Sequence, residues 1–243
     1  VYFLYVTLKG CFMFQRNKLA CVVAGVVLAV GATAASATTI DFTKASTGTS
    51  GMAGNVGWTL TAGTNVGLAG TANNSQLFDG SDSDLSGTGL ALQRDGYGVR
   101  SALDKQTSDD EISSIKKGSE YLQLTFDWAV KLTGASFLDL FIAANGDFEE
   151  GYAETDDGTI IAFSATDLAN SGGSKRAGFA GGSFVGIVTQ SIKFYIGLGN
   201  DAQGVADGAL ASVDIAPVPV PAAGLLMLGG LGGLVALRRR KTA

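Results

Sequence analysis

Acidic side chains are the residues of this sequence that could hold a metal ion, and they gather in four short stretches. These are Asp82 and Asp84, then Asp109 to Glu111, then Asp147 with Glu149 and Glu150, and finally Asp156 with Asp157. Calcium takes about six to eight oxygen ligands in flexible geometry, which acidic loops between strands can supply. We predict calcium ligands at Asp109, Asp110 and Glu111, because this run lies between two turn-and-strand segments. Solvated charge in turns is the alternative interpretation.

The residue types restrict enzymatic chemistry severely. The sequence contains no histidine, and its two cysteines, Cys11 and Cys21, lie near the N-terminus, so histidine triads and histidine zinc sites are excluded. A glycosidase needs two carboxylates facing each other across a sugar, a separation that a sequence cannot establish. The run from Ser113 to Lys116 fits the Ser-x-x-Lys pattern, but the partner motifs of acyl-enzymes are missing. We therefore predict no catalytic residues and no enzyme, and no cofactor other than calcium.

Tyrosine and tryptophan rings are candidates for binding sugars, because each offers an apolar face together with a polar group. We predict that Tyr121 and Trp58 contact such a ligand, and Tyr121 stands on the polar face of its expected strand. Tyr97, Tyr152 and Tyr195 are further candidates. The alternative is that each ring packs in the core or at its edge.

Residues 38–216 are expected to form an all-β body that positions these side chains. Along Glu120–Val130, Leu122, Leu124, Phe126 and Trp128 fall on one face of a strand. Many short strands with Gly-containing turns predict an antiparallel β-sandwich of the jelly-roll type. Other strands are expected at Thr39–Phe42, Trp58–Ala62, Gly89–Gln93, Ala135–Ile142, Thr159–Ser164, Ser183–Val188, Ser191–Gly197 and Leu210–Ile215, and turns at Asp79-Gly80, Asp95-Gly96, Asn145-Gly146, Asp157-Gly158 and Asp207-Gly208.

Residues 1–37 are expected to be a signal peptide. Arg16 and Lys18 precede the apolar run Leu19–Ala32, and Ala35 and Ala37 supply the small side chains that signal peptidase accepts, which makes Thr38 the mature N-terminus. The natural start of the chain is open, with Met13 as a candidate, and a transmembrane anchor is the alternative for the apolar run. All 22 acidic residues but only ten of the 17 basic ones lie in the body. So negative a body disfavours nucleic acid as a partner.

Residues 217–243 form a tail with three parts. Pro217, Pro219 and Pro221 give an extended spacer, Ala222–Leu237 is a run of 16 uncharged residues, and Arg238, Arg239, Arg240 and Lys241 follow as a basic stop. As a helix the run would rise about 24 Å, shorter than the roughly 30 Å hydrocarbon core of a bilayer. The body is expected on the outer side of the membrane, because both basic clusters stay inside.

The tail resembles the PEP-CTERM sorting signal in its VPxPA variant, on the motif residues Val218, Pro219, Val220, Pro221, Ala222 and Ala223 with the helix and basic cluster after them. The resemblance implies processing by an exosortase-like membrane protease-transferase. A second stretch, about residues 95–140, is similar to a segment recurring in PEP-CTERM surface proteins. The similarity lies in Gly96 to Val99, Asp110 to Ile112, Glu120 to Phe126 and Val130 to Leu132. This second similarity implies a β-sandwich fold and no activity. For the C-terminal tail, residues 217–243, an ordinary tail anchor is the alternative to a sorting signal.

Together these patterns predict an exported protein of the cell surface or extracellular matrix. It would begin as a precursor in the inner membrane with its body on the periplasmic side, and its partners would be signal peptidase, an exosortase-like enzyme and extracellular polysaccharide of a biofilm. A calcium-dependent carbohydrate-binding module is the first alternative, and a secreted hydrolase is the second.

Overall fold

The computed structural model describes residues 37–80, 85, 87–103, 110–143, 145–168, 176–197 and 205–218. These residues form 14 strands and no α-helix, so the prediction of an all-β, mostly antiparallel body is confirmed. The predicted signal helix and C-terminal helix lie outside the described residues, as do Ala35, Asp109, Pro219 to Ala223 and Arg238 to Lys241. Within the part that is described, no helix is long and apolar enough to cross a membrane.

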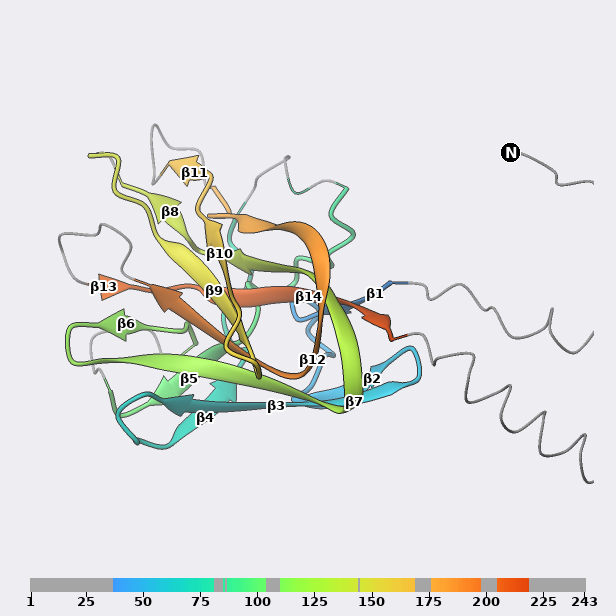
Figure 1. The fold of residues 1–243 in the computed structure, drawn as a ribbon. Helices are drawn as coiled ribbons and strands as arrows, with labels where there is room; N and C mark the ends of the chain where they lie inside the picture. The colour runs from blue at the N-terminus through green and yellow to red at the C-terminus, as the bar shows by residue number, and fades with distance from the viewer. Residues whose placement is uncertain are drawn as a thin grey trace, which may run out of the picture. The chain divides into compact units, whose positions relative to one another are not determined.

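The main sheet follows the order β1-β14-β7-β12-β9-β10, with β2 and β3 joined to it through β7 (Figure 1). The strands are β1 (Thr38–Asp41), β2 (Ser50–Ala53), β3 (Val56–Thr64), β4 (Gly70–Asn73), β5 (Gly98–Ser101), β6 (Ser114–Ile115), β7 (Gly118–Leu138), β8 (Phe141–Ile142), β9 (Glu150–Thr155), β10 (Ile160–Ser164), β11 (Asp167–Leu168), β12 (Ala180–Gly197), β13 (Val205–Ala206) and β14 (Ala209–Pro217). Only β8 and β11 pair in parallel among these strands.

Two long strands, β7 and β12, are neighbours at the centre of the main sheet, and both bend along their length (Figure 1). The first part of β7, Glu120 to Phe126, pairs with β3, whereas the part from Val130 onward pairs with β14. Strand β12 pairs with both parts, and its register shifts between Thr189 and Ser191. The two strands predicted at Ser183–Val188 and Ser191–Gly197 are therefore one bulged strand, which follows the bend of its partner.

One apolar core lies beneath both parts of β7. Leu122, Leu124 and Phe126 point inward as the alternation predicts, and they share the core with Val213 and Ile215 of β14. Phe42 packs edge-on against Trp58 and Tyr97, with ring centroids 5.6 and 5.5 Å apart. The interior is thus filled by side chains from strands far apart in sequence, which fixes the register of the outward-facing residues.

Two of the expected strands are corrected. Gly89–Gln93 forms no strand: Leu92 has a φ of 50°, and its amide donates to the Thr43 hydroxyl at 2.9 Å. This side-chain acceptor replaces a strand partner. The strand expected at Ala135–Ile142 is broken at Asp139, whose φ is 61°.

Candidate functional site

Three tyrosines form a row across adjacent strands on the outer face of the sheet. Tyr195 of β12 pairs with Tyr152 of β9, and the β12–β7 register, in which Phe194 pairs with Leu122, brings Tyr195 next to Tyr121 of β7. Their sequence neighbours Leu122, Phe194 and Ala153 are buried in the core, so strand alternation turns the tyrosines outward. The structure thus joins Tyr121, Tyr152 and Tyr195, three of the predicted sugar-binding candidates, in one tyrosine row.

Two glycines let rings of the tyrosine row lie against the sheet. A Cβ on Gly63, which pairs with Tyr121, would stand 2.6 Å from the Tyr121 hydroxyl, and a Cβ on Gly197 would stand 2.3 Å from the Tyr152 ring. Tyr152 and Tyr195 are stacked, with centroids 5.2 Å apart and an interplanar angle of 14°. The Lys193 ammonium lies 5.0 Å from the centre of the Tyr121 ring. The row therefore consists of one stacked pair of rings and a third ring with a cation over its face.

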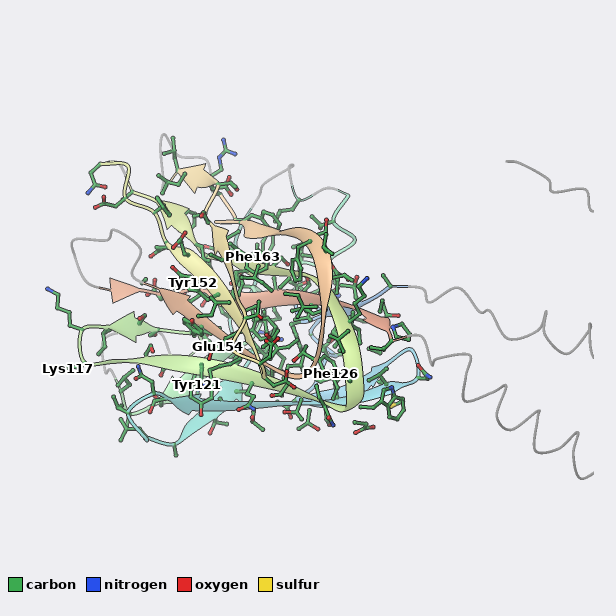
Figure 2. All side chains as sticks on the ribbon, viewed as in Figure 1. Lys117, Tyr121, Phe126, Tyr152, Glu154 and Phe163 are labelled. Carbon is green, nitrogen blue, oxygen red and sulfur yellow. The ribbon has the colours of Figure 1, made fainter. Side chains whose placement is uncertain are left out.

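Polar side chains border the tyrosine row. Gln123 and Lys193 face each other across β7 and β12, and Lys193 pairs in turn with Glu154 of β9. Figure 2 shows Tyr121, Tyr152 and Glu154 on these strands. Burial, then the hydrogen bond that the phenol donates to Glu150, raises the pKa of Tyr152 to about 12. The phenol keeps its proton at neutral pH, so the tyrosine row combines ring faces with hydrogen-bond donors and acceptors.

The two tryptophans of the body occupy the opposite environments from those expected. Trp58 is only 6% exposed and packs against Phe42, so its ring does not offer the open face that stacking on a sugar requires. Trp128 was expected to point inward but is 48% exposed. It lies at the bend of β7, between Phe126, the last residue paired with β3, and Val130, the first paired with β14. Simple alternation contains no signal for such a bend.

A second feature is the acidic loop cluster, defined here as Asp79, Asp95, Asp110, Glu111, Asp139 and Asp207. Its members come from four loops: the long connection from β4 to β5, the connection from β5 to β6, the segment after β7 and the connection from β13 to β14. Burial, followed by repulsion from Asp79, Glu111 and Asp110, raises the pKa of Asp95 to about 7. Burial, followed by repulsion from Asp95 and other acids of the cluster, likewise raises the pKa of Asp139 to about 7.

Two of the predicted calcium ligands belong to this cluster. Asp110 accepts a hydrogen bond from the Ser75 hydroxyl at 2.9 Å, and the Glu111 carbonyl accepts one from the Val99 amide at 3.0 Å. Among the described residues, no three acidic side chains stand close enough together to hold a metal ion as they are. The sequence prediction missed Asp95, which is buried, and Asp139, which is half-buried with its Oδ2 atom enclosed. Asp95-Gly96 was interpreted only as a turn, and Asp139 as part of a strand.

The acidic pair Asp156 and Asp157 forms a different structure, the turn between β9 and β10. Asp156 accepts hydrogen bonds from the Thr189 hydroxyl at 2.9 Å and the Gln190 amide at 3.1 Å. Asp157 accepts bonds from the Thr155 hydroxyl at 2.6 Å and the Thr159 amide at 3.0 Å. These bonds lower both pKa values, the Gln190 amide contributing most for Asp156 and the Thr155 hydroxyl for Asp157. These acids are structural turn residues.

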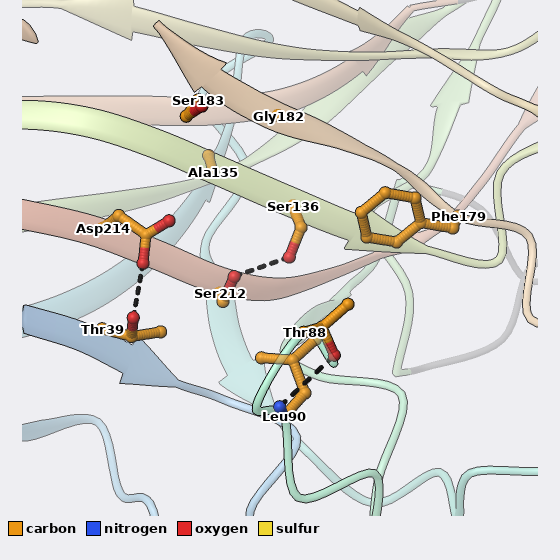
Figure 3. A pocket seen from close by; sticks show the side chains of 10 residues that line it. All are labelled: Thr39, Thr88, Leu90, Ala135, Ser136, Phe179, Gly182, Ser183, Ser212 and Asp214. Carbon is orange, nitrogen blue, oxygen red and sulfur yellow. Dashed lines mark hydrogen bonds between the residues drawn. The ribbon is translucent and has the colours of Figure 1, made fainter. Parts of the chain in front are cut away.

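A shallow pocket of about 200 Å³ lies beside β1, β14 and β7 (Figure 3). The Ser136 and Ser212 hydroxyls in it are 2.6 Å apart and bond to each other, and Thr39 donates to Asp214 at 2.5 Å. These polar groups link neighbouring strands at the pocket. The two serine hydroxyls bond to each other, and neither is bonded to a side chain of the described residues that could act as a general base.

Known proteins add no further constraint on the site, because no protein-family model, curated protein or solved structure matches the chain. Its function must therefore be argued from its own residues.

Proposed function

We propose that this protein is an exported β-sandwich of the jelly-roll type, located at the cell surface or in the extracellular matrix, that binds extracellular polysaccharide through the tyrosine row. The row carries the proposal. Three rings on neighbouring strands give apolar and polar contacts to a ligand that crosses the strands, and the bordering Gln123, Lys193 and Glu154 can bond to sugar hydroxyls.

Export and sorting are supported by the ends of the folded body. Strand β1 begins at Thr38, directly after the proposed cleavage site, and β14 ends at Pro217, where the proline motif starts. The two strands are antiparallel neighbours and Thr38 pairs with Ile215, so the chain enters and leaves the body at the same end. This arrangement suits a precursor with both terminal segments in one membrane, processed first by signal peptidase and then by an exosortase-like enzyme.

The test of polysaccharide binding is co-sedimentation of the exported protein with insoluble exopolysaccharide. Replacing both Tyr121 and Tyr195 by Ala should weaken the apparent affinity at least about tenfold, or roughly 1.4 kcal/mol, because the ring faces are lost. Replacing both by Phe should retain most of the binding. Trp128→Ala is the matched control, because it removes an exposed ring outside the row. Equal retention of the double Ala variant and the native protein would refute the proposal.

The sorting part has its own test. Neutral residues in place of Arg238, Arg239, Arg240 and Lys241 should reduce membrane retention of the precursor, since a short apolar run depends on its basic stop. Cell fractionation measures the retention, and sequencing of the exported protein should find Thr38 first. Unchanged fractionation, or a mature protein that keeps residues 19–32, would count against this route.

A further inference from the structure

Four buried side-chain oxygens lack a hydrogen-bond partner among the described residues. They are Asn74 Oδ1, Asp95 Oδ2, Ser113 Oγ and Asp139 Oδ2. All four lie in loops that carry the acidic loop cluster or directly beside such a loop: Asn74 precedes Ser75, the residue bonded to Asp110, and Ser113 follows Glu111 by two positions. Buried polar atoms nearly always have a partner, so four exceptions in one set of loops require an explanation.

The loops that carry these oxygens are held by close backbone contacts. A Cβ on Gly98 would stand 1.9 Å from the Asp110 carbonyl oxygen, and a Cβ on Gly96 would stand 2.2 Å from that of Leu210. Tyr97 and Leu210 exchange two backbone hydrogen bonds, and the Asp139 amide donates to the Ala177 carbonyl at 3.0 Å. The carboxyl groups of Asp95 and Asp139 are therefore positioned by the fold and remain available for a ligand.

The environment of Asp95 selects a positively charged ligand. The residue is 2% exposed, and three acidic neighbours repel its negative form. An unpaired buried charge is costly, and a cation or a proton is what removes this cost. Oxygen atoms of carboxylate, amide and hydroxyl groups are hard ligands, which calcium prefers.

We propose that the acidic loop cluster binds one calcium ion through Asp95 and Asp139, with the amide oxygen of Asn74 and water completing its coordination. Calcium accepts irregular geometry and mixed oxygen ligands, whereas magnesium requires near-octahedral geometry and gives up water reluctantly. No three acidic side chains of the described residues form a ready-made ion site, so the amide oxygen and water must supply the ligands beyond the two carboxyl groups. The site does not depend on the tyrosine row or on polysaccharide binding.

The experiment is thermal melting of the purified full chain, at a pH above the pKa of both carboxyl groups, in calcium chloride, magnesium chloride or chelator at equal ionic strength. Calcium should raise the melting temperature by several degrees, because an ion that binds only the folded state stabilises it. Magnesium should raise it much less. The double variant Asp95→Asn/Asp139→Asn should lose the calcium shift and melt higher than the native protein in chelator. Asp156→Asn, in the turn between β9 and β10, is the matched control and should keep the whole shift.

Identical melting in calcium and chelator would overturn the proposal and would leave a proton as the ligand of these carboxyl groups. A calcium shift that survives in the double variant would place the ion elsewhere and would overturn it equally. If the double variant does not fold, terbium luminescence of the native protein decides the matter. Tyr97, two residues from Asp95, should sensitise one bound terbium ion per chain, which calcium displaces. Absence of sensitised emission would refute the site.

Discussion

The turn at Asp156 and Asp157 and the acidic loop cluster contain the same residue type in opposite states. In the turn, each carboxylate accepts two hydrogen bonds from nearby hydroxyl and amide groups, and its pKa is lowered. In the cluster, Asp95 and Asp139 each have a buried oxygen without a partner, and their pKa values are raised to about 7. The difference arises from the donors around each acid and from its burial.

This contrast shows which acids of the sequence deserve a functional interpretation. Asp156 and Asp157 are consecutive, and donors surround both: Asp157 is satisfied by residues two positions away, and Asp156 by the neighbouring bulge of β12. Asp95 and Asp139 are isolated in sequence and meet only because the loops converge. The hydrogen bonds of Asp156 and Asp157 therefore account for both as turn residues, whereas the unpartnered oxygens of Asp95 and Asp139 support the cation site proposed above.

The largest expected effect is the pH dependence of the cluster in chelator. The unfolded chain loses the protons of Asp95 and Asp139 near pH 4, and the folded protein keeps them until about pH 7. The unfolded state binds fewer protons in this window, so stability falls as pH rises, by about 1.4 kcal/mol per pH unit for each carboxyl group. Urea unfolding at several pH values measures the slope. If the free energy of unfolding instead rises throughout this window, the pKa values of Asp95 and Asp139 are not raised in the folded protein, and the acidic loop cluster does not differ from the turn in this respect.

The second prediction compares a glycine from each region. Gly96→Ala should destabilise the protein by about 3 kcal/mol or more, because the new Cβ would meet the Leu210 carbonyl and the φ of 137° is unfavourable for alanine. Gly158→Ala, in the turn, should cost only about 1 kcal/mol, since its φ is 83° but no atom lies within 4 Å of the added Cβ. Chemical denaturation of both variants gives the two values. Equal losses would mean that the loops around Asp95 are no more tightly fixed than the turn.

These two glycines also show how far the sequence predicts the molecule. The turn at Asp157-Gly158 and the inward residues Leu122, Leu124 and Phe126 of β7 follow from local pattern, because φ preference and alternation act over a few residues. At Asp95-Gly96 the glycine has a positive φ but the chain forms no turn. The convergence of the cluster depends on contacts such as Tyr97 with Leu210, which are more than a hundred positions apart. The alternation predicts that Tyr121 faces outward, but its position beside Tyr195 and Tyr152 is set by the register of three strands. Long-range pairing of this kind leaves no local signal.

The third prediction tests the link between the turn and β12. Thr189 is buried, and its hydroxyl contacts the carboxylate of Asp156 and the carbonyl of Ser191. Thr189→Val keeps the shape of the side chain but removes the hydroxyl, so we expect a loss of about 1–2 kcal/mol. Denaturant unfolding measures the loss, with Thr61→Val on an exposed strand position as control. A loss no larger than that of the control would show that solvent, not Thr189, satisfies Asp156.

The smallest effect is expected for Asp156→Asn, and its pH dependence has the opposite sign to that of the cluster. The Gln190 amide and the Thr189 hydroxyl favour the charged form of Asp156, so its pKa is lower in the folded protein than in the unfolded chain. The stabilisation is therefore complete above about pH 4 and is lost as pH falls through the folded pKa. Because the carboxylate is largely in solvent, we expect only about 0.5–1 kcal/mol at neutral pH. The native protein and the variant should thus differ at neutral pH and converge in acid, as measured by urea unfolding at both. A difference that persists unchanged in acid would show that the asparagine disturbs the packing of the turn, since loss of a charge can no longer matter once the native carboxyl group is protonated.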